Sequence, residues 1–68
     1  MGEHIKTSVL TLRKKHGITQ EEVAHAVGVT RQTIIAIEKG NYTPSVLLAI
    51  KLARFFKTTV ENLFHYEK

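Results

Sequence analysis

The hydrophobic positions of the chain recur at helical spacing, in segments separated by glycine, proline and short polar runs. Gly17, Gly28, Gly40 and Pro44 mark the breaks, because glycine commonly follows the end of a helix and proline cannot continue one. Between the breaks, apolar residues three and four positions apart indicate helices with one buried face. The pattern predicts helices over residues 7–16, 20–27, 31–39, 46–56 and 60–64.

Hydroxyl side chains stand immediately before the later helices, where they accept hydrogen bonds from the first turn. They are Thr19, Thr30, Ser45 and Thr59, and Thr19 with Glu22 has the spacing of a capping box. The inner faces predict a core, with Leu10 as a further candidate, of Val9, Leu12, Val23, Ala24, Val27, Ile34, Ile37, Leu48, Ala49, Leu52, Phe55 and Phe56.

The two ends of the chain alternate loosely between polar and apolar residues, over 3–6 and 63–66. Such segments either pair as two short strands or remain frayed. The fold class that we predict is therefore an all-α, five-helix domain over residues 1–68, with this short two-stranded pairing as an open addition.

A chain of 68 residues buries a thin core, and without cysteine it has no disulfide to stabilise it. Well-packed helices or a second copy of the chain must then supply stability, which favours a homodimer. Apolar residues in excess of one core predict its interface on the long fourth helix and on residues 57–68. They are Leu47, Phe56, Leu63, Phe64 and Tyr66.

The sequence also indicates the cellular compartment of the protein. The apolar stretch 45–56 is too short to span a bilayer and carries Lys51 and Arg54. The first residues lack the apolar run of a signal peptide. With no cysteine present, we expect a cytoplasmic protein.

The two short helices within residues 20–39 have the features of a helix-turn-helix. Ala24 is small where the helices touch, and Gly28 accepts a left-handed backbone at the turn. Val29, Ile34 and Ile37 supply the apolar contacts that hold the second helix against the first. Together these offsets are specific, whereas an ordinary helical hairpin would show only one or two of them.

With these residues in place, the chain resembles the Cro/C1-repressor type of helix-turn-helix, the Xre family, over about residues 7–64. The resemblance rests on Leu12-Arg13, GITQEEVA at 17–24, GVTRQTI at 28–34, IEKG at 37–40 and Pro44-Ser45. It implies a lambda-repressor-like fold and, as in single-domain members, a homodimer. It also implies that Gln20 clamps the DNA backbone and that Arg13 and Glu38 form an internal ion pair.

The outer face of residues 31–39 suits a DNA major groove. Arg31 can donate two hydrogen bonds to guanine, and Gln32 can pair both ways with adenine. Ile35 either contacts a thymine methyl or is an isolated surface residue, and Ala36 allows close approach. The net charge of +4 also favours a polyanion, although a basic protein can carry such a charge without binding one.

Around this face lie candidate contacts to DNA phosphates, which position a protein without reading sequence. Gln20 begins a helix, where free N–H groups favour an anion, while Thr30 has a structural alternative as a cap. The full set of candidates is Gln20, Thr30, Thr33, Lys39, Asn41, Tyr42 and Thr43.

Arg13 and Glu38 allow two interpretations, because each lies on the apolar side of its helix. They are surface charges, with Arg13 contacting DNA, or they form the internal pair, which we favour. The histidines show no metal-binding spacing, and no nucleophile has a base beside it. We therefore expect no enzyme activity, no metal, no cofactor and no small-molecule substrate.

The leading hypothesis is a sequence-specific regulator, in particular a repressor, that binds double-stranded DNA as a homodimer on a palindromic operator. One alternative is the DNA-binding antitoxin of a toxin–antitoxin pair, which often carries an added inhibitory arm. Another is a protein-interaction domain that keeps the fold without binding DNA. The polar, basic face of residues 31–39 speaks against the second alternative.

Overall fold

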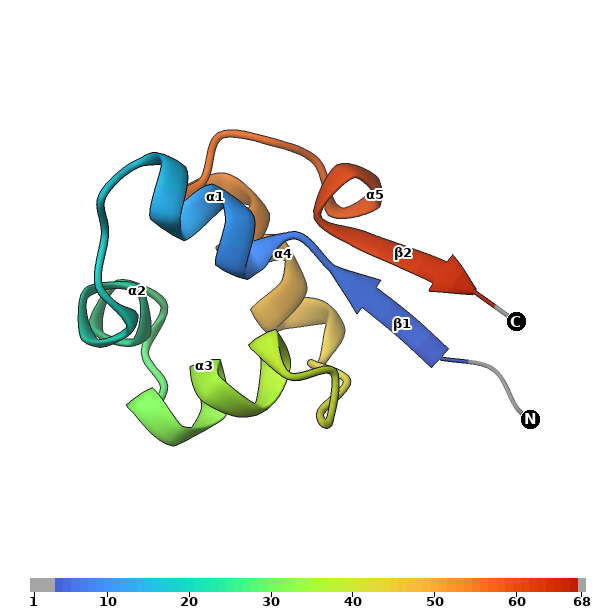
Figure 1. Ribbon diagram of the computed structural model, residues 1–68, viewed down its shortest axis with the longest axis horizontal. Coiled ribbons are helices and arrows are strands. Elements are labelled where there is room, and N and C mark those ends of the chain that lie inside the picture. The colour runs from blue at the N-terminus through green and yellow to red at the C-terminus, as the bar shows by residue number, and fades with distance from the viewer. Residues whose placement is uncertain (1–3, 68) are drawn as a thin grey trace.

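A computed structural model describes residues 4–67 of the chain as five helices and a two-stranded sheet (Figure 1). No helix of this range has the length and apolar character needed to cross a membrane. The elements in chain order are β1 (His4–Thr7), α1 (Val9–Lys15), α2 (Gln20–Val27), α3 (Arg31–Glu38), α4 (Val46–Phe55), α5 (Val60–Leu63) and β2 (Phe64–Glu67).

The five helices occur where the sequence predicts them, and their ends agree to within two residues. The first begins at Val9 rather than at Thr7, because Thr7 belongs to β1 and its hydroxyl accepts a hydrogen bond from the Val9 N–H at 3.1 Å. The last ends at Leu63, since Phe64 already has extended backbone angles and begins β2.

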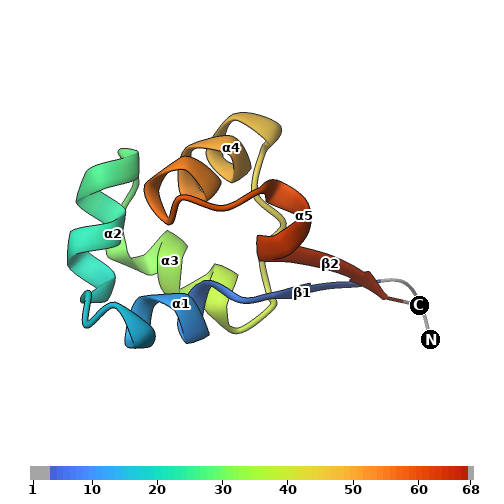
Figure 2. The ribbon, with the colours of Figure 1, turned by 90° about the horizontal axis from the view of Figure 1, so that it is seen from above.

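The chain ends pair as two strands, so of the two alternatives that the sequence left open the described residues show the pairing. β1 and β2 run antiparallel, with Ile5 opposite Tyr66 and Thr7 opposite Phe64. The sheet extends from the helical body at the end opposite α2 (Figures 1 and 2). A hydrogen bond from the Ser8 N–H to the Leu63 carbonyl, at 2.8 Å, continues this connection into the helices.

The predicted caps are present at α2, α3, α4 and α5. The Thr19 hydroxyl accepts from the Glu22 N–H at 3.0 Å, and the Glu22 carboxylate accepts from the Thr19 N–H at 2.8 Å, which completes the capping box. Thr30, Ser45 and Thr59 each accept from the N–H three residues later. Sequence-local hydrogen bonds therefore define where these helices begin.

The core lies between the inner faces of the helices, with α2 packed against both α3 and α4. Leu12 and Phe55 are only partly buried against it, and Leu10 points outward at 37% exposure, which corrects its assignment as a core candidate. The buried residues are Val9, Val23, Ala24, Val27, Ile34, Ile37, Leu48, Ala49, Leu52, Ala53, Phe56 and Leu63.

Two residues predicted for a dimer interface lie in this core instead. Phe56 is 7% exposed, and its ring lies edge-on against Phe55 at 5.0 Å between centroids. Leu63 is fully buried, because the short helix α5 folds it back toward α4. One core thus uses both side chains, and the prediction that they are surplus to it is wrong.

The turn between α2 and α3 depends on Gly28, which has a left-handed backbone at φ +79°. Its N–H donates to the Ala24 carbonyl at 2.9 Å, and the Val29 N–H donates to the same oxygen at 2.9 Å. These bonds end α2 and turn the chain within three residues. The small Ala24 is buried beneath the turn, as the helix-turn-helix pattern requires.

Candidate nucleic-acid interface

The outer side of α3 is set by the residues that α3 buries. Ile34 and Ile37 are almost completely buried, so the side of the helix that carries Arg31 and Gln32 faces solvent. In Figure 1, α3 follows one edge of the helical body, with no other element beyond it. The two side chains that can form paired hydrogen bonds with base edges are therefore exposed at the N-terminal end of an accessible helix.

Ile35 and Ala36 are half-buried rather than fully exposed. Ile35 thus presents only part of its side chain to solvent, and the thymine contact and the surface residue without a DNA role both stay predictions. Its partial exposure limits any DNA contact to the outer part of the side chain. Ala36 adds only a methyl group to this side of the helix, whereas Ile35, four positions from both Arg31 and Lys39, lies between them.

Residues with polar side chains border α3 at both ends. Thr30 is exposed, but its hydroxyl is the α3 cap and also lies 3.2 Å from the hydroxyl of the half-buried Thr33. Lys39 is exposed directly after the helix, where a cation is favoured by the helix dipole. The structural role of Thr30 as a cap is thus present, and any phosphate contact would be additional.

The loop after α3 is held against that helix by its backbone. Gly40, at φ +78°, donates to the Ile37 carbonyl at 3.0 Å, and the Asn41 N–H donates to the Ala36 carbonyl at 2.9 Å. Asn41, Tyr42 and Thr43 are all exposed. The turn therefore keeps this polar loop beside the end of α3.

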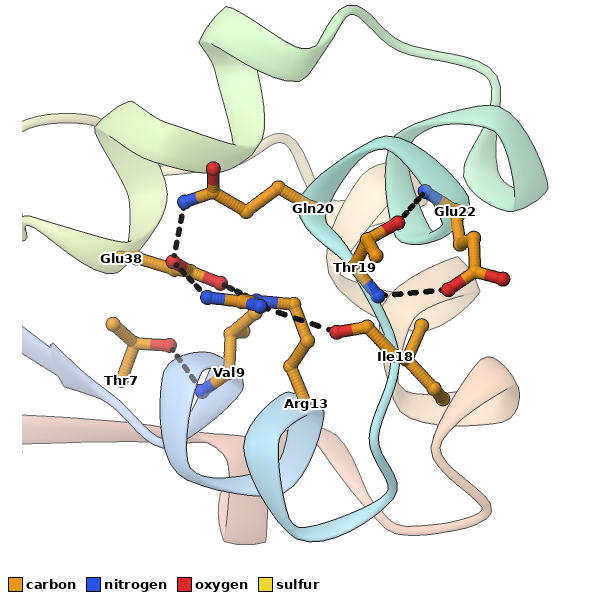
Figure 3. Close-up of polar contacts among 8 residues, drawn as sticks. All are labelled: Thr7, Val9, Arg13, Ile18, Thr19, Gln20, Glu22 and Glu38. Carbon is orange, nitrogen blue, oxygen red and sulfur yellow. Dashed lines mark hydrogen bonds and ion pairs between the residues drawn. The ribbon is translucent and has the colours of Figure 1, made fainter.

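An ion pair links α1 to the end of α3. Arg13 Nε donates to Glu38 Oε2 at 2.7 Å, and Arg13 Nη2 donates to Glu38 Oε1 at 3.2 Å (Figure 3). Arg13 Nη1 donates to the Ile18 carbonyl at 3.1 Å. The Arg13 side chain is 13% exposed and the Glu38 side chain 5%, so the two residues form the internal pair. The guanidinium points into the protein and not toward solvent.

The hydrogen bond to Glu38 raises the pKa of the Arg13 guanidinium above its ordinary value, against the opposing effect of burial. Arg13 therefore stays charged through the neutral range, so its carboxylate partner keeps a counterion. This matters because an unpaired carboxylate with so little exposure is costly.

Gln20 joins this pair through a contact that the sequence analysis missed. Its Nε2 donates to Glu38 Oε1 at 2.9 Å, so one carboxylate oxygen accepts from both Arg13 and Gln20. The predicted clamp at the start of α2 is thus in direct contact with the end of α3. No sequence spacing indicates such a bond, because it depends on how α2 and α3 cross.

The sequence analysis found the apolar surface at the start of α4 only in part, because it named Leu47 but neither Val46 nor Ile50. Val46, Leu47 and Ile50 are 77%, 64% and 42% exposed. Their spacing places them on the side of α4 opposite Leu48 and Leu52, and this stripe was visible in the sequence. Beside it lies a shallow groove of about 190 Å³ lined by Ile5, Thr43, Pro44, Val46, Ala49, Val60 and Phe64.

Comparison with known proteins agrees with this geometry. The HTH-type transcriptional regulator MJ0272 of Methanocaldococcus jannaschii is 51% identical over 63 residues, which cover 93% of this chain and 96% of that protein. The cryptic phage CTXphi transcriptional repressor RstR of Vibrio cholerae is 35% identical over 57 residues, covering 84% of this chain and 51% of RstR.

Among solved structures, the restriction-modification controller protein C.AhdI from Aeromonas hydrophila superposes with a TM-score of 0.72 at 26% identity. The match covers 78% of this chain and 80% of C.AhdI. Residues 9–63, from the start of α1 to the end of α5, match the helix-turn-helix family HTH_3. The chain belongs to this family of non-enzymatic, DNA-binding transcriptional regulators.

Proposed function

We propose that the chain is a sequence-specific repressor that binds a palindromic operator as a homodimer, with α3 in the major groove. The observation that supports this most directly is the exposure of Arg31 and Gln32 on the side of α3 opposite the buried Ile34 and Ile37. Residues at the start of a recognition helix are those that reach base edges. Arginine and glutamine are suited to guanine and adenine, respectively.

Polar groups around α3 would hold the DNA backbone on either side of the groove. Before α3 these are Gln20 and Thr30, within its first turn Thr33, and after it Lys39, Asn41, Tyr42 and Thr43. Contacts of this kind fix the register of the helix but do not choose a sequence. Lys39 is the charged member and would release a counterion on binding.

Repression, rather than activation, is favoured by one relative. RstR is named as a transcriptional repressor, and its match covers 84% of this chain. None of the relatives above is named as an antitoxin or as a protein-interaction domain, so we propose neither alternative.

The homodimer is supported by the apolar surface at the start of α4. Val46 and Leu47 project there beside the groove that Ile5 and Phe64 help to line. Tyr66 is 58% exposed and lies opposite Ile5 in the sheet, so its side chain shares the face of the sheet that Ile5 presents. The apolar surface thus continues from α4 to the sheet.

We assign this surface to a second copy of the chain, because it carries a projecting apolar side chain next to a groove. A projection and a groove side by side can be paired by one twofold axis, with the Val46 of each copy entering the groove of the other. The contact would involve Leu47, Phe64 and Tyr66 from the original prediction, and would add Val46 and Ile50. Two recognition helices about 34 Å apart would then match half-sites one helical turn apart.

Selection of bound duplexes from a random library tests the proposal directly. The expected product is a sequence with twofold symmetry and half-sites separated by about 10 base pairs from centre to centre. Recovery of duplexes without any common sequence would remove the claim of specific recognition. A single unrepeated half-site would remove the symmetric dimer.

A further inference from the structure

The carboxylate of Glu38 accepts hydrogen bonds from both Arg13 and Gln20. Its two carboxylate oxygens accept from Arg13 at 2.7 and 3.2 Å, and Oε1 also accepts from Gln20 Nε2 at 2.9 Å. These residues come from α3, α1 and α2, respectively, so the contact joins the three helices at one point (Figure 3).

The chemistry of the acceptor fixes the orientation of the Gln20 side chain. A carboxylate only accepts hydrogen bonds, whereas the two ends of a glutamine amide differ, one being a double donor and the other an acceptor. Glu38 therefore selects the nitrogen end, and Figure 3 shows the Gln20 oxygen directed away from the carboxylate. One of the two Nε2 hydrogens is used in this bond, and the second is left for another acceptor.

Gln20 is the first residue of α2 and is only partly buried. An anion at this position would meet the free N–H groups of the helix start. On the basis of the function proposed above, we propose that Glu38, held by Arg13, positions Gln20 for DNA binding, because it directs the second amide hydrogen of Gln20 toward the phosphate backbone.

Arg13 makes such an arrangement compatible with DNA. A lone carboxylate close to a phosphate would repel it, whereas a carboxylate that shares two hydrogen bonds with a guanidinium carries a neutralised charge. The pair also restricts the rotamers of Gln20 before DNA arrives, so less freedom is lost on binding. The ion pair would thus contribute to DNA affinity through Gln20, in addition to its effect on folding.

A double-mutant cycle on DNA affinity tests the inference. Gln20→Ala in the otherwise unchanged chain should weaken binding to the selected operator by about tenfold. In an Arg13→Met/Glu38→Leu background, whose apolar pair replaces the ion pair at similar volume, the same change should weaken binding by only about twofold. The measurement is fluorescence anisotropy on the operator duplex and on a random duplex at one salt concentration.

Glu61→Gln is the matched control, because it removes one acidic charge from the exposed surface of α5, away from α3. In that background Gln20→Ala should keep its full effect. Glu38→Gln is a second background, to be used if the Arg13→Met/Glu38→Leu protein does not fold. A glutamine at 38 both donates and accepts, so either end of the Gln20 amide can face it, and the effect of Gln20→Ala should shrink again.

The outcomes separate this inference from the function on which it rests. An equal loss from Gln20→Ala in every background, with specific binding intact, overturns the positioning role and leaves the proposed function standing. Failure of the unchanged chain to prefer its selected operator over random DNA overturns the proposed function itself. The side-chain amide signals of Gln20 provide a direct readout, because Glu38→Gln should shift them in the free protein if the hydrogen bond is present in solution.

Discussion

Arg13 of α1 and Glu38 of α3 stand 25 positions apart in the chain and meet through two hydrogen bonds, of 2.7 and 3.2 Å. Because the Glu38 side chain is 5% exposed, removing it leaves the guanidinium without its counterion inside the protein. We expect Glu38→Ala to lower the free energy of unfolding by about 3 kcal/mol. Urea denaturation followed by circular dichroism measures this loss.

The apolar exchange Arg13→Met/Glu38→Leu is the control for that prediction. It removes both charges together and should leave stability within about 1 kcal/mol of the starting protein. The folded-state pKa of Arg13 is raised, so stabilisation through this shift is present below the ordinary value of the group and is lost only as pH rises through the higher one. The stability difference should therefore not vary with the ionisation of Arg13 near neutral pH. An unchanged urea midpoint for Glu38→Ala would show that the pair is not structural.

Gly28 provides a test of the turn that is independent of packing. A Cβ added at this position would meet nothing within 4 Å, so the only cost of a side chain is the left-handed backbone at φ +79°. We expect Gly28→Ala to destabilise the fold by about 1–2 kcal/mol. Gly28→Asn should cost less, since asparagine tolerates this conformation better than alanine. Equal urea midpoints for Gly28→Ala and the unchanged chain would contradict the assigned turn.

The sequence predicts the helices well, because the signals that define them are local. Gly28 ends α2, Thr30 begins α3, and Ile34 and Ile37 determine which side of α3 is buried. Each of these effects operates within one or two turns of helix. The orientation of Arg31 and Gln32 follows from the same periodicity, which explains why the exposed side of α3 could be predicted.

The sequence does not predict the features that depend on packing between distant segments. Leu63 resembles a surplus apolar residue in the sequence, but α5 carries it into the core. The bond between Gln20 and Glu38 arises from the crossing of α2 and α3, which no spacing encodes. The strand pairing of the ends depends on contacts more than fifty positions apart, such as Ile5 with Tyr66, so the pattern could only leave it open.

The proposed dimer predicts that a charge on the apolar surface of α4 separates the subunits. Val46→Glu and Leu47→Glu each replace a highly exposed apolar side chain with a carboxylate that would be buried in the apolar interface. We expect either change to raise the dimer dissociation constant by about tenfold or more. Sedimentation velocity across micromolar concentrations measures the shift, and DNA binding should move toward single half-sites.

Leu10→Glu is the matched control, because Leu10 is an exposed leucine on α1. This substitution should leave the dimer intact. A monomer at micromolar concentration that binds a lone half-site as tightly as a full operator would contradict the proposed symmetric assembly.

The assignment of base reading to α3 predicts that Arg31 and Gln32 control specificity. Arg31→Ala or Gln32→Ala should cost about 1–3 kcal/mol of binding free energy on the selected operator and relax the preference at particular base pairs. Binding to random DNA should change much less for Gln32→Ala, which removes no charge. Both variants should keep the unfolding midpoint of the starting protein, because the two side chains are exposed.

Lys39→Ala should behave differently, because Lys39 is assigned to the DNA backbone. Its loss should weaken binding to operator and random duplexes alike, and should lower the slope of log affinity against log salt by about one. Titrations of both duplexes at several salt concentrations separate the two patterns. If Arg31→Ala and Gln32→Ala instead weaken both duplexes equally, with every base preference retained, α3 does not read sequence. The specific-recognition proposal then fails, although the helix-turn-helix fold is unaffected.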